Sequence, residues 1–505
     1  MKIGNRTSYS SGAGEKALPL ILLFSLALYT FYTSGFPAYA MVCMIPLVII
    51  LAMTPFQNRM TLFWVLFIVN YSLQIRGVNL PVPMSIPNEM LEILLLILAI
   101  IDLDRTPFER TANLMMFALT VWCSYCILEV LNDTCSIGIN VGAWYTGTRM
   151  MAFQLMYAFL VYVLYISDSK ILVKYLVVWG CASLFAVFWA WKQQHIGFTR
   201  EEDLWVHTRG ATTHILQGGT LIRYFSVYSD ASNYGIGIAS TGVAFTIFGI
   251  TQKIKKLKYF FLFTGLACIW GTLPSGTRTA TACLIAGFGA YIFLSKSFKI
   301  AIPFTVVFAL AFFVLAFTTI GNGNQQIRRM RSAFNKDDAS ANQRTINQQT
   351  MKKYMSEAPF GIGLGMGNDN VPANNKFRLM ATIAPDSEYV FIWLRTGAVG
   401  ITTFIITMLM MLGGACKIVF FDIKSDSLRG IGAGLCCAFI SQQLGGYGNQ
   451  VLMQFPNCLI FYGGLSIVYV LPHIEQEWND YEARQLALQA EKERLKLEKK
   501  RAKRV

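Results

Sequence analysis

Two carboxyl groups stand just before a long apolar run in the stretch PDSEYVFIWLRTGAVG, where one serine separates Asp386 from Glu388. Apolar surroundings can raise the pKa of a carboxyl group and make it a usable general base. The same residues also suit a helix start, with Asp386 or Ser387 as the N-cap and Glu388 near the positive end of the helix dipole. Because capping and catalysis are compatible, Asp386 and Glu388 are the leading candidates for proton transfer.

Histidine, the commonest general base at neutral pH, is scarce in this chain. Of the four histidines, His195, His207 and His214 lie in a polar segment before residue 231, and His473 lies near the C-terminal tail. His207 and His214 are therefore secondary candidates for the base.

Arg223 stands in the stretch LIRYFSVYSDASNYGIGIAS, whose small residues begin the next apolar run. Ser229, Asp230 and Ser232 are plausible N-cap residues, and a helix N-terminus at the membrane interface would favour an anionic group. Arg223 is thus a candidate anion ligand, and Asp230 is a secondary candidate at the same site. The alternative is an interfacial aromatic belt with an arginine that reaches lipid headgroups.

Arg278 lies in a tight loop of small residues, GTLPSGTRTATACLIAG, between two apolar runs. A charge near the bilayer is costly unless it has a partner, so Arg278 is a candidate functional residue. The alternative is an arginine that snorkels to the membrane surface.

The long polar segment ANQRTINQQTMKKYMSEAPFGIGLGMGNDN contains a further basic candidate, Arg344, near the front of an expected helix. Arg344 could contact phosphate or sugar, or it could be a solvated loop charge. GIGLGMG lacks the GK[ST] of a phosphate-binding loop and has no strand–helix–strand context. Its glycines therefore predict a turn or a close backbone approach.

The segments that must position these residues are apolar. The chain has 505 residues, of which 54% are hydrophobic and 14% charged, whereas soluble proteins carry about 25% charged residues. Runs of roughly 17–25 apolar residues recur, each long enough to cross a bilayer as a helix. We therefore predict an all-α polytopic membrane protein with about 12–14 transmembrane helices. The expected spans are 17–35, 36–53, 60–75, 88–103, 113–131, 151–167, 171–193, 231–250, 257–275, 279–295, 300–320, 387–420, 428–448 and 457–472.

Alternation of these spans from a cytoplasmic start predicts five regions and places both termini in the cytoplasm. The segments placed inside, among them QKIKKLK, SKSFK, DIKSDSLR and the tail, are rich in lysine, as the positive-inside rule requires. The net charge of +15 therefore predicts contact with membrane lipids and not with nucleic acid. The regions are a cytoplasmic arm 1–16, a helix bundle 17–320 with a periplasmic loop 194–230, a large periplasmic loop 321–386, C-terminal helices 387–472, and a basic cytoplasmic tail helix 473–505.

Arginine dominates the segments placed outside. Lysine suffices to set topology, whereas arginine suits bidentate binding of phosphate. Basic residues on the wrong side for topology need another reason, and recognition of a phosphorylated ligand is the leading interpretation. These arginines are Arg76, Arg149, Arg200, Arg209, Arg223 and Arg278, followed in the long loop by Arg328, Arg329, Arg331, Arg344 and Arg378.

Together these motifs resemble the O-antigen ligase and O-antigen polymerase superfamily, which includes bacterial protein O-oligosaccharyltransferases. The resemblance covers roughly residues 215–470 and rests on Arg223, the SGTRTA loop, Arg344, PFGIGLGMG and the stretch that follows. Family ligases typically carry His-Asn-x-Tyr with glycines eleven and fourteen residues after the histidine. Here that motif reads Asp386, Ser387, Glu388 and Tyr389, with Gly397 and Gly400 at those offsets. Asp386 stands where the family has histidine.

The resemblance implies a metal-independent glycosyltransferase of the GT-C-like membrane type, without a cofactor, in the bacterial inner membrane. Its donor would be a glycan on undecaprenyl pyrophosphate at the periplasmic face. Arg223 and Arg278 would hold the pyrophosphate and stabilise charge on the leaving group. Asp386 or Glu388 would accept the proton of an acceptor hydroxyl that attacks the anomeric carbon with inversion.

The acceptor stays open within this class. Lipid A core would make the protein a ligase, another lipid-linked glycan a polymerase, and a protein serine or threonine an oligosaccharyltransferase. The ligase is favoured slightly, because PDSEY stands where ligases carry their histidine motif. A flippase or transporter for a polyprenyl glycan is the alternative of another class, but it predicts repeat symmetry and charges at the bilayer midplane.

Overall fold

The computed structural model describes residues 58–76, 85–216, 221–295, 339–383 and 385–502, together with single positions at 25, 306, 310, 313, 318, 319, 323 and 328. The expected arm 1–16 and the expected spans 17–35, 36–53 and 300–320 lie outside the described residues, apart from such single positions. The chain divides into two compact units, Met1–Leu66 and Phe67–Val505. All candidate site residues belong to the second unit.

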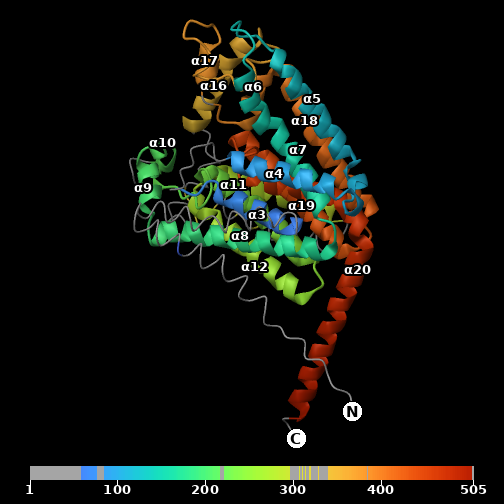
Figure 1. The fold of residues 1–505 in the computed structure, drawn as a ribbon. Coiled ribbons are helices and arrows are strands. Elements are labelled where there is room, and N and C mark those ends of the chain that lie inside the picture. Colours follow the sequence, from blue (N-terminus) through green and yellow to red (C-terminus); the bar gives the residue numbers. More distant parts are fainter. Residues whose placement is uncertain are drawn as a thin grey trace. The chain divides into compact units, whose positions relative to one another are not determined.

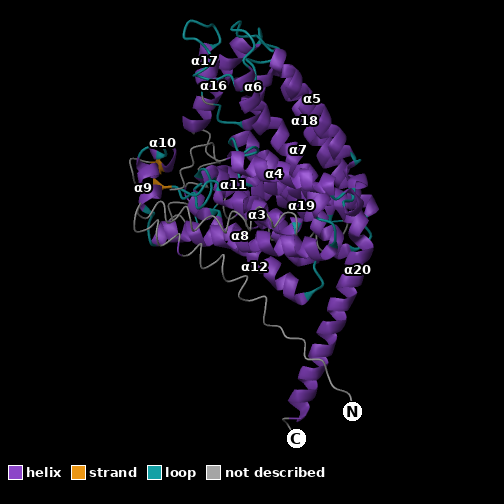
Figure 2. Ribbon diagram, in the orientation of Figure 1, coloured by secondary structure: helices purple, strands orange, loops and turns teal. Residues whose placement is uncertain are grey.

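Helices make up the first half of the described chain. They are α3 (Arg59–Ser72), α4 (Ser85–Ile101), η1 (Leu103–Arg105), η2 (Phe108–Thr111), α5 (Leu114–Leu128), η3 (Glu129–Leu131), α6 (Val141–Thr148), the π-helical turn η4 (Arg149–Phe153), α7 (Gln154–Tyr165), α8 (Ser169–His195), α9 (Arg200–His207) and α10 (Ala211–His214). A short antiparallel ribbon follows, in which β1 (Ile215–Leu216) pairs with β2 (Leu221–Ile222). Figure 2 shows this ribbon beside α9 and α10.

The second half contains the longest helices. They are α11 (Ala231–Thr251), α12 (Lys255–Gly271), η6 (Leu273–Ser275), α13 (Arg278–Leu294), α16 (Ala339–Met355), α17 (Arg378–Thr382), α18 (Glu388–Lys417), the π-helical turn η8 (Ile418–Asp422), α19 (Asp426–Gly448) and α20 (Asn457–Ala502). Helix α20 continues through Pro472, so the last expected span and the expected tail form one helix (Figure 1).

The predicted class, an all-α polytopic membrane protein, is confirmed. Among the described residues, seven helical segments are long and apolar enough to cross a membrane, and α13 is a shorter apolar helix of 17 residues. Most of these segments start and end close to the expected spans. The seven segments are Leu114–Leu131, Val141–Tyr165, Ser169–His195, Ala231–Thr251, Lys255–Ser275, Glu388–Asp422 and Asn457–Lys499.

Helix α11 lies at the centre of the bundle, with 89% of its apolar window buried. It packs against α12, α13 and α19; α11, α12 and α19 are labelled in Figure 1. The sequence ASNYGIGIASTGVAF explains this position, because small residues let helices approach closely in a membrane. A Cβ atom at Gly235 would overlap the side chain of Ser275, and one at Gly237 would overlap Asn457. The start of α11 is therefore in direct contact with the loop before α13 and with the start of α20.

The described part of the large loop folds into a cap with its own apolar core. Buried side chains of α16 and the following segment, including Met351, Met355 and Ile362, pack against Cys135 and against Leu394 of α18. This packing joins the loop after α5, α16, α17 and the first half of α18 (Figure 1). The cap leads directly into the stretch that carries Asp386 and Glu388.

The PFGIGLG segment fills a break in α18. Gly397, inside α18, has φ 67° and ψ −167°, so the carbonyl groups of the preceding turn lose their helical partners. The backbone N–H of Ile362 donates to Leu394 O at 3.0 Å, and that of Gly363 donates to Arg395 O at 3.0 Å. Cβ atoms at Gly361 or Gly397 would overlap the backbone of the other segment. The predicted close backbone approach is confirmed.

We expect Gly397→Ala to destabilise the protein by about 3 kcal/mol or more, because it adds left-handed strain and breaks this backbone contact. Thermal unfolding of the purified protein in detergent measures the change. Gly413→Ala in the same helix is the matched control, since a Cβ atom there meets nothing within 4 Å. Equal unfolding temperatures for the two variants would contradict the assigned role of Gly397.

Candidate active site

Arg223 holds the small-residue loop that precedes α13. Its Nε donates to Ser275 O at 3.1 Å, and its Nη2 donates to Thr277 Oγ1 at 2.9 Å. Nη2 also donates to Ser232 Oγ at 2.9 Å, and Nη1 donates to Thr213 O at 3.0 Å. One guanidinium therefore ties the SGTR loop to the start of α11, and the geometry gives Arg223 a clear role in positioning this loop.

The first turn of α11 is capped from two sides. Asp230 is the N-cap, and its Oδ1 accepts from the backbone N–H groups of Ser232 and Asn233 at 2.7 and 2.9 Å. His214 Nε2 accepts from the backbone N–H of Ala231 at 3.1 Å. Thr277 Oγ1 donates to Ala231 O at 2.9 Å and so connects this turn to the loop before α13. The expected capping role of Asp230 is confirmed.

His214 is buried, and its ring nitrogens are both engaged. Nδ1 lies 2.8 Å from Thr213 Oγ1 and 3.2 Å from Gly210 O, while Nε2 accepts from Ala231. Burial, followed by the nearby positive charge of Arg223, lowers the pKa of His214 to about 4. A neutral ring that accepts a backbone hydrogen bond serves the helix start, which favours a structural role over that of general base.

His214 should make the protein less stable in acid. Its pKa is lower in the folded than in the unfolded chain, so the unfolded chain takes up the proton first as the pH falls. The free energy of unfolding that the neutral ring contributes is fully present above pH 6.5. It decreases as the pH falls to about 4, by about 3 kcal/mol at most. Unfolding measured across this range should show a weaker pH dependence for His214→Gln than for the native chain. His207→Gln, at an exposed ring, is the control and should leave the dependence unchanged.

Arg278 is the first residue of α13, directly after the loop that Arg223 holds. The adjacent Thr279 Oγ1 accepts from Asn449 Nδ2 at 3.1 Å. A Cβ atom at Gly448 would also contact the Thr279 side chain. The connection between α19 and α20 therefore lies against the start of α13, beside Arg278.

The other side of this connection contacts the DSEY motif. Glu388 is 3% exposed, and its Oε2 accepts from the backbone N–H of Leu452 at 3.0 Å. Ser387 Oγ donates to Gly446 O at 3.2 Å. Tyr389 OH donates to Gln443 Oε1 at 2.9 Å. Residues 446–452 thus bridge the start of α13, directly after the SGTR loop, and the DSEY motif, which are more than a hundred positions apart in the chain.

The two candidate carboxyl groups occupy different environments. Ser387 is the N-cap residue of α18, and Glu388 is its first residue. Of the two expected capping positions, Ser387 is correct and Asp386 is not, because Asp386 precedes the cap. Asp386 is exposed whereas Glu388 is buried. Asp386 can therefore meet a substrate directly, while Glu388 holds the bridging connection in place.

Within the described residues, four helices begin around this connection: α11, α13, α18 and α20. Asn233 Nδ2 of α11 donates to Phe455 O at 3.1 Å, and Asn457 Nδ2 of α20 donates to Asn233 O at 3.0 Å. Helix N-termini carry partial positive charge and exposed N–H groups, which suit an anion. Together with Arg278, these helix starts form a polar cluster at one end of an apolar bundle.

The remaining candidates stand apart from these contacts. His207 lies in α9, and its Nδ1 is 3.3 Å from Asp203 Oδ1. Arg344 lies within α16, and its side chain is outside what the structure describes. Among the described residues, no group of three or more His, Cys, Asp or Glu side chains is placed to hold a metal ion. Metal independence stays a prediction.

Several of the arginines predicted to lie outside have structural partners, and for these the leading interpretation, recognition of a phosphorylated ligand, is not needed. Arg76 stacks on the Trp205 ring at 3.9 Å and donates to Ser229 O. Arg149 is buried and pairs with Glu89 at 3.2 Å. Arg378 donates to backbone carbonyl groups of the cap. An arginine in a segment predicted to lie outside therefore does not by itself indicate phosphate binding.

Sequence reasoning missed the bridging connection. Its signal is the polar run SQQLGGYGNQ, which interrupts an apolar segment. Gln442 Nε2 donates to Val451 O at 3.1 Å, and Gln450 Nε2 donates to Pro385 O. Amide side chains in a transmembrane segment suggest buried hydrogen bonds, but the sequence does not identify their partners.

The apolar helices define a multi-pass membrane protein, and the polar cluster where four helices begin is its candidate site. Residues 260–405 match the family model described as O-antigen ligase. The match supports the predicted place of the chain in the O-antigen ligase and polymerase superfamily, and this family indicates a membrane glycosyltransferase-like enzyme. The matched range includes Arg278, Arg344, the PFGIGLG segment and the DSEY motif, whereas Arg223 and the bridging connection lie outside it. No curated protein matched the chain.

Proposed function

We propose that this protein transfers a glycan from undecaprenyl pyrophosphate to an acceptor hydroxyl at the periplasmic face, as a ligase of surface polysaccharide biosynthesis. The family match supports the general activity. The observation that carries the specific proposal is the bridge through residues 446–452, which brings the start of α13 and the start of α18 to one place. An anion site and an exposed carboxyl group are thereby neighbours across a short segment.

Arg278 and the surrounding helix starts bind the pyrophosphate of the donor. A guanidinium offers a planar pair of donors that matches phosphate oxygens. Fixed N–H dipoles and a nearby arginine stabilise the negative charge that develops on the leaving pyrophosphate. Arg223 contributes its charge and also sets the position of Arg278, because it holds Ser275 and Thr277.

Asp386 accepts the proton from the acceptor hydroxyl. The hydroxyl oxygen attacks the anomeric carbon, the bond from that carbon to the pyrophosphate oxygen breaks, and the pyrophosphate retains the electron pair. One displacement of this kind inverts the anomeric centre. The energy of the pyrophosphate linkage drives the transfer, so the reaction requires no nucleotide.

The acceptor class is tested by incubating the purified protein with a lipid-linked glycan and each of three acceptors. The acceptors are lipid A core, a second lipid-linked glycan, and a peptide with serine and threonine. We expect the glycan on lipid A core. Product on the lipid-linked glycan would make the protein a polymerase, and product on the peptide an oligosaccharyltransferase. Movement of the donor across vesicle membranes without any product would favour a transporter and overturn the proposal.

A further inference from the structure

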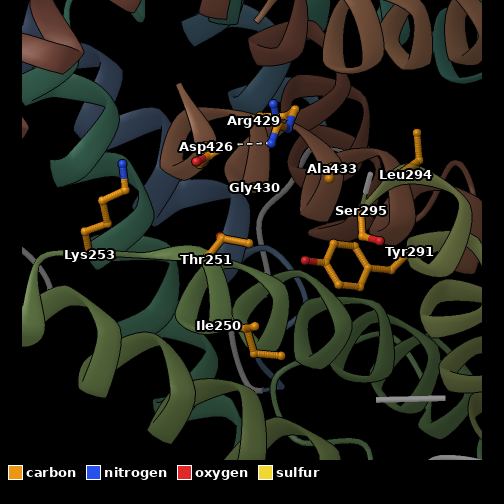
Figure 3. A pocket seen from close by; sticks show the side chains of 10 residues that line it. All are labelled: Ile250, Thr251, Lys253, Tyr291, Leu294, Ser295, Asp426, Arg429, Gly430 and Ala433. Atoms are coloured by element: carbon orange, nitrogen blue, oxygen red, sulfur yellow. Dashed lines mark hydrogen bonds and ion pairs between the residues drawn. The ribbon is translucent and has the colours of Figure 1, made fainter. Parts of the chain in front are cut away.

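A polar cavity lies at the end of α11 that is opposite the candidate active site. It has a volume of about 280 Å³, and its walls come from the ends of α11 and α13 and the start of α19. Figure 3 shows Tyr291, Ser295 and Thr251 on one side and Arg429, Asp426 and Lys253 around the remainder. The cavity combines basic, hydroxyl and apolar side chains.

This cavity is separate from the candidate active site. Helix α11 has 21 residues, which corresponds to about 30 Å along its axis, close to the thickness of the hydrocarbon core. Asp230 caps the end at the active site, whereas Thr251 ends the helix at the cavity. The two sites therefore lie about one bilayer thickness apart.

Three of the lysine-rich segments that the expected topology places in the cytoplasm each contribute a residue to the lining of this cavity. Lys253 belongs to QKIKKLK, Ser295 begins SKSFK, and Arg429 ends DIKSDSLR. Their meeting at one cavity puts it at the expected headgroup level of the cytoplasmic leaflet. Ile250 and Leu294 also line the cavity and give it an apolar wall for the lipid beside the headgroup.

The basic side chains at the cavity are accessible. The Arg429 side chain is 22% exposed and forms an ion pair with Asp426, marked by the dashed line in Figure 3. The Lys253 side chain is 48% exposed, and its Nζ lies 3.5 Å from Glu482 Oε2. The Asp426 side chain is 67% exposed, and ion pairs exposed to solvent contribute little free energy, so Arg429 can turn from Asp426 to a competing anion. Lys253 pairs with a carboxyl group that is itself buried.

We infer that this cavity binds the headgroup of an anionic phospholipid from the cytoplasmic leaflet. Arg429 and Lys253 contact the phosphodiester, for which the guanidinium supplies a two-donor fork. Basic cavities between transmembrane helices on the cytoplasmic side suit anionic headgroups. Asp426 competes with the phosphate for Arg429 and so limits affinity.

Native mass spectrometry of the delipidated full-length protein tests this site with equal amounts of phosphatidylglycerol and phosphatidylcholine. We expect preferential retention of phosphatidylglycerol, and a loss of about fivefold for Arg429→Gln or Lys253→Gln. Lys255→Gln is the matched control, because Lys255 pairs with Glu493 and does not line the cavity. Asp426→Asn should increase retention, since it releases Arg429.

Several outcomes would overturn the inference. Native-like retention by both Arg429→Gln and Lys253→Gln would show that these residues do not bind lipid, and equal retention of the two lipids would remove the charge preference. Displacement of phosphatidylglycerol by inorganic phosphate at the same concentration would assign the cavity to free phosphate. If Arg429→Gln does not fold, Arg429→Lys keeps the charge without the fork, and native-like retention by that variant would contradict a guanidinium contact.

Discussion

Arg278→Lys should lower glycan transfer by about 100-fold while the protein still inserts into the membrane and folds. Lysine keeps the positive charge but cannot present two parallel donors to phosphate oxygens. The position of Arg278 at the first residue of α13 makes the geometry demanding, because Arg223 and Asn449 fix the loop and the helix start around it. Transfer of labelled glycan from the lipid-linked donor measures the effect.

The matched control is Arg209→Lys, the same substitution at an exposed arginine of another segment that is predicted to lie outside. It should leave transfer unchanged, because Arg209 lies outside the contacts that join the SGTR loop and the DSEY motif. Native-like transfer by Arg278→Lys would remove Arg278 from the donor site.

Asp386→Asn should reduce transfer by roughly 100-fold or more, since an amide cannot accept the proton of the acceptor hydroxyl. Glu388→Gln should be much milder. The carboxylate of Glu388 accepts from Leu452 N–H, and the amide oxygen of glutamine can accept the same hydrogen bond. Both variants keep nearly the native volume, so a difference between them reports chemistry.

The order of these two effects decides the assignment of the base. A severe loss for Glu388→Gln with a mild loss for Asp386→Asn would make the buried carboxyl group the base. Melting temperatures of both variants serve as the control, because a folding defect would lower transfer for either substitution.

The sequence predicts the transmembrane helices well, because long apolar runs directly reflect the bilayer. It predicts less well where polar residues belong to a helix. Val141–Tyr165 is one apolar helical segment, although its first turns, VGAWYTGTR, look like a connecting loop. Arg149 lies there buried against Glu89, and such pairing lets a charge enter a helical bundle. Sequence alone does not reveal that partner.

The site was predictable where chemistry is local in sequence. SGTR and DSEY stand out because charged residues interrupt apolar surroundings. The bridge between them depends on Asn449 and Thr279, which are 170 positions apart, and no periodicity encodes that contact. The same limit applies to Arg223, whose chemistry suggests anion binding but whose hydrogen bonds hold a loop.

The glycines of PFGIGLG and α18 show one contact type that the sequence predicts and one partner that it does not. PFGIGLG predicts a close backbone approach, and the contact with α18 confirms it. The partner was not predictable, because Gly397 interrupts α18 within a run that otherwise favours an uninterrupted helix. The spacing of Gly397 from the DSEY motif therefore has a structural explanation, because the PFGIGLG segment of the cap binds at the break that Gly397 makes in α18.

Donor binding and single-turnover transfer, measured together on Arg278→Lys and Asp386→Asn, test the central claim most directly. If Arg278 holds the donor and Asp386 takes the proton of the acceptor, Asp386→Asn will bind the undecaprenyl-pyrophosphate-linked donor with native affinity but transfer glycan roughly 100-fold or more slowly. Arg278→Lys will lose donor affinity. Native donor affinity in Arg278→Lys, or native transfer by Asp386→Asn, would contradict the account.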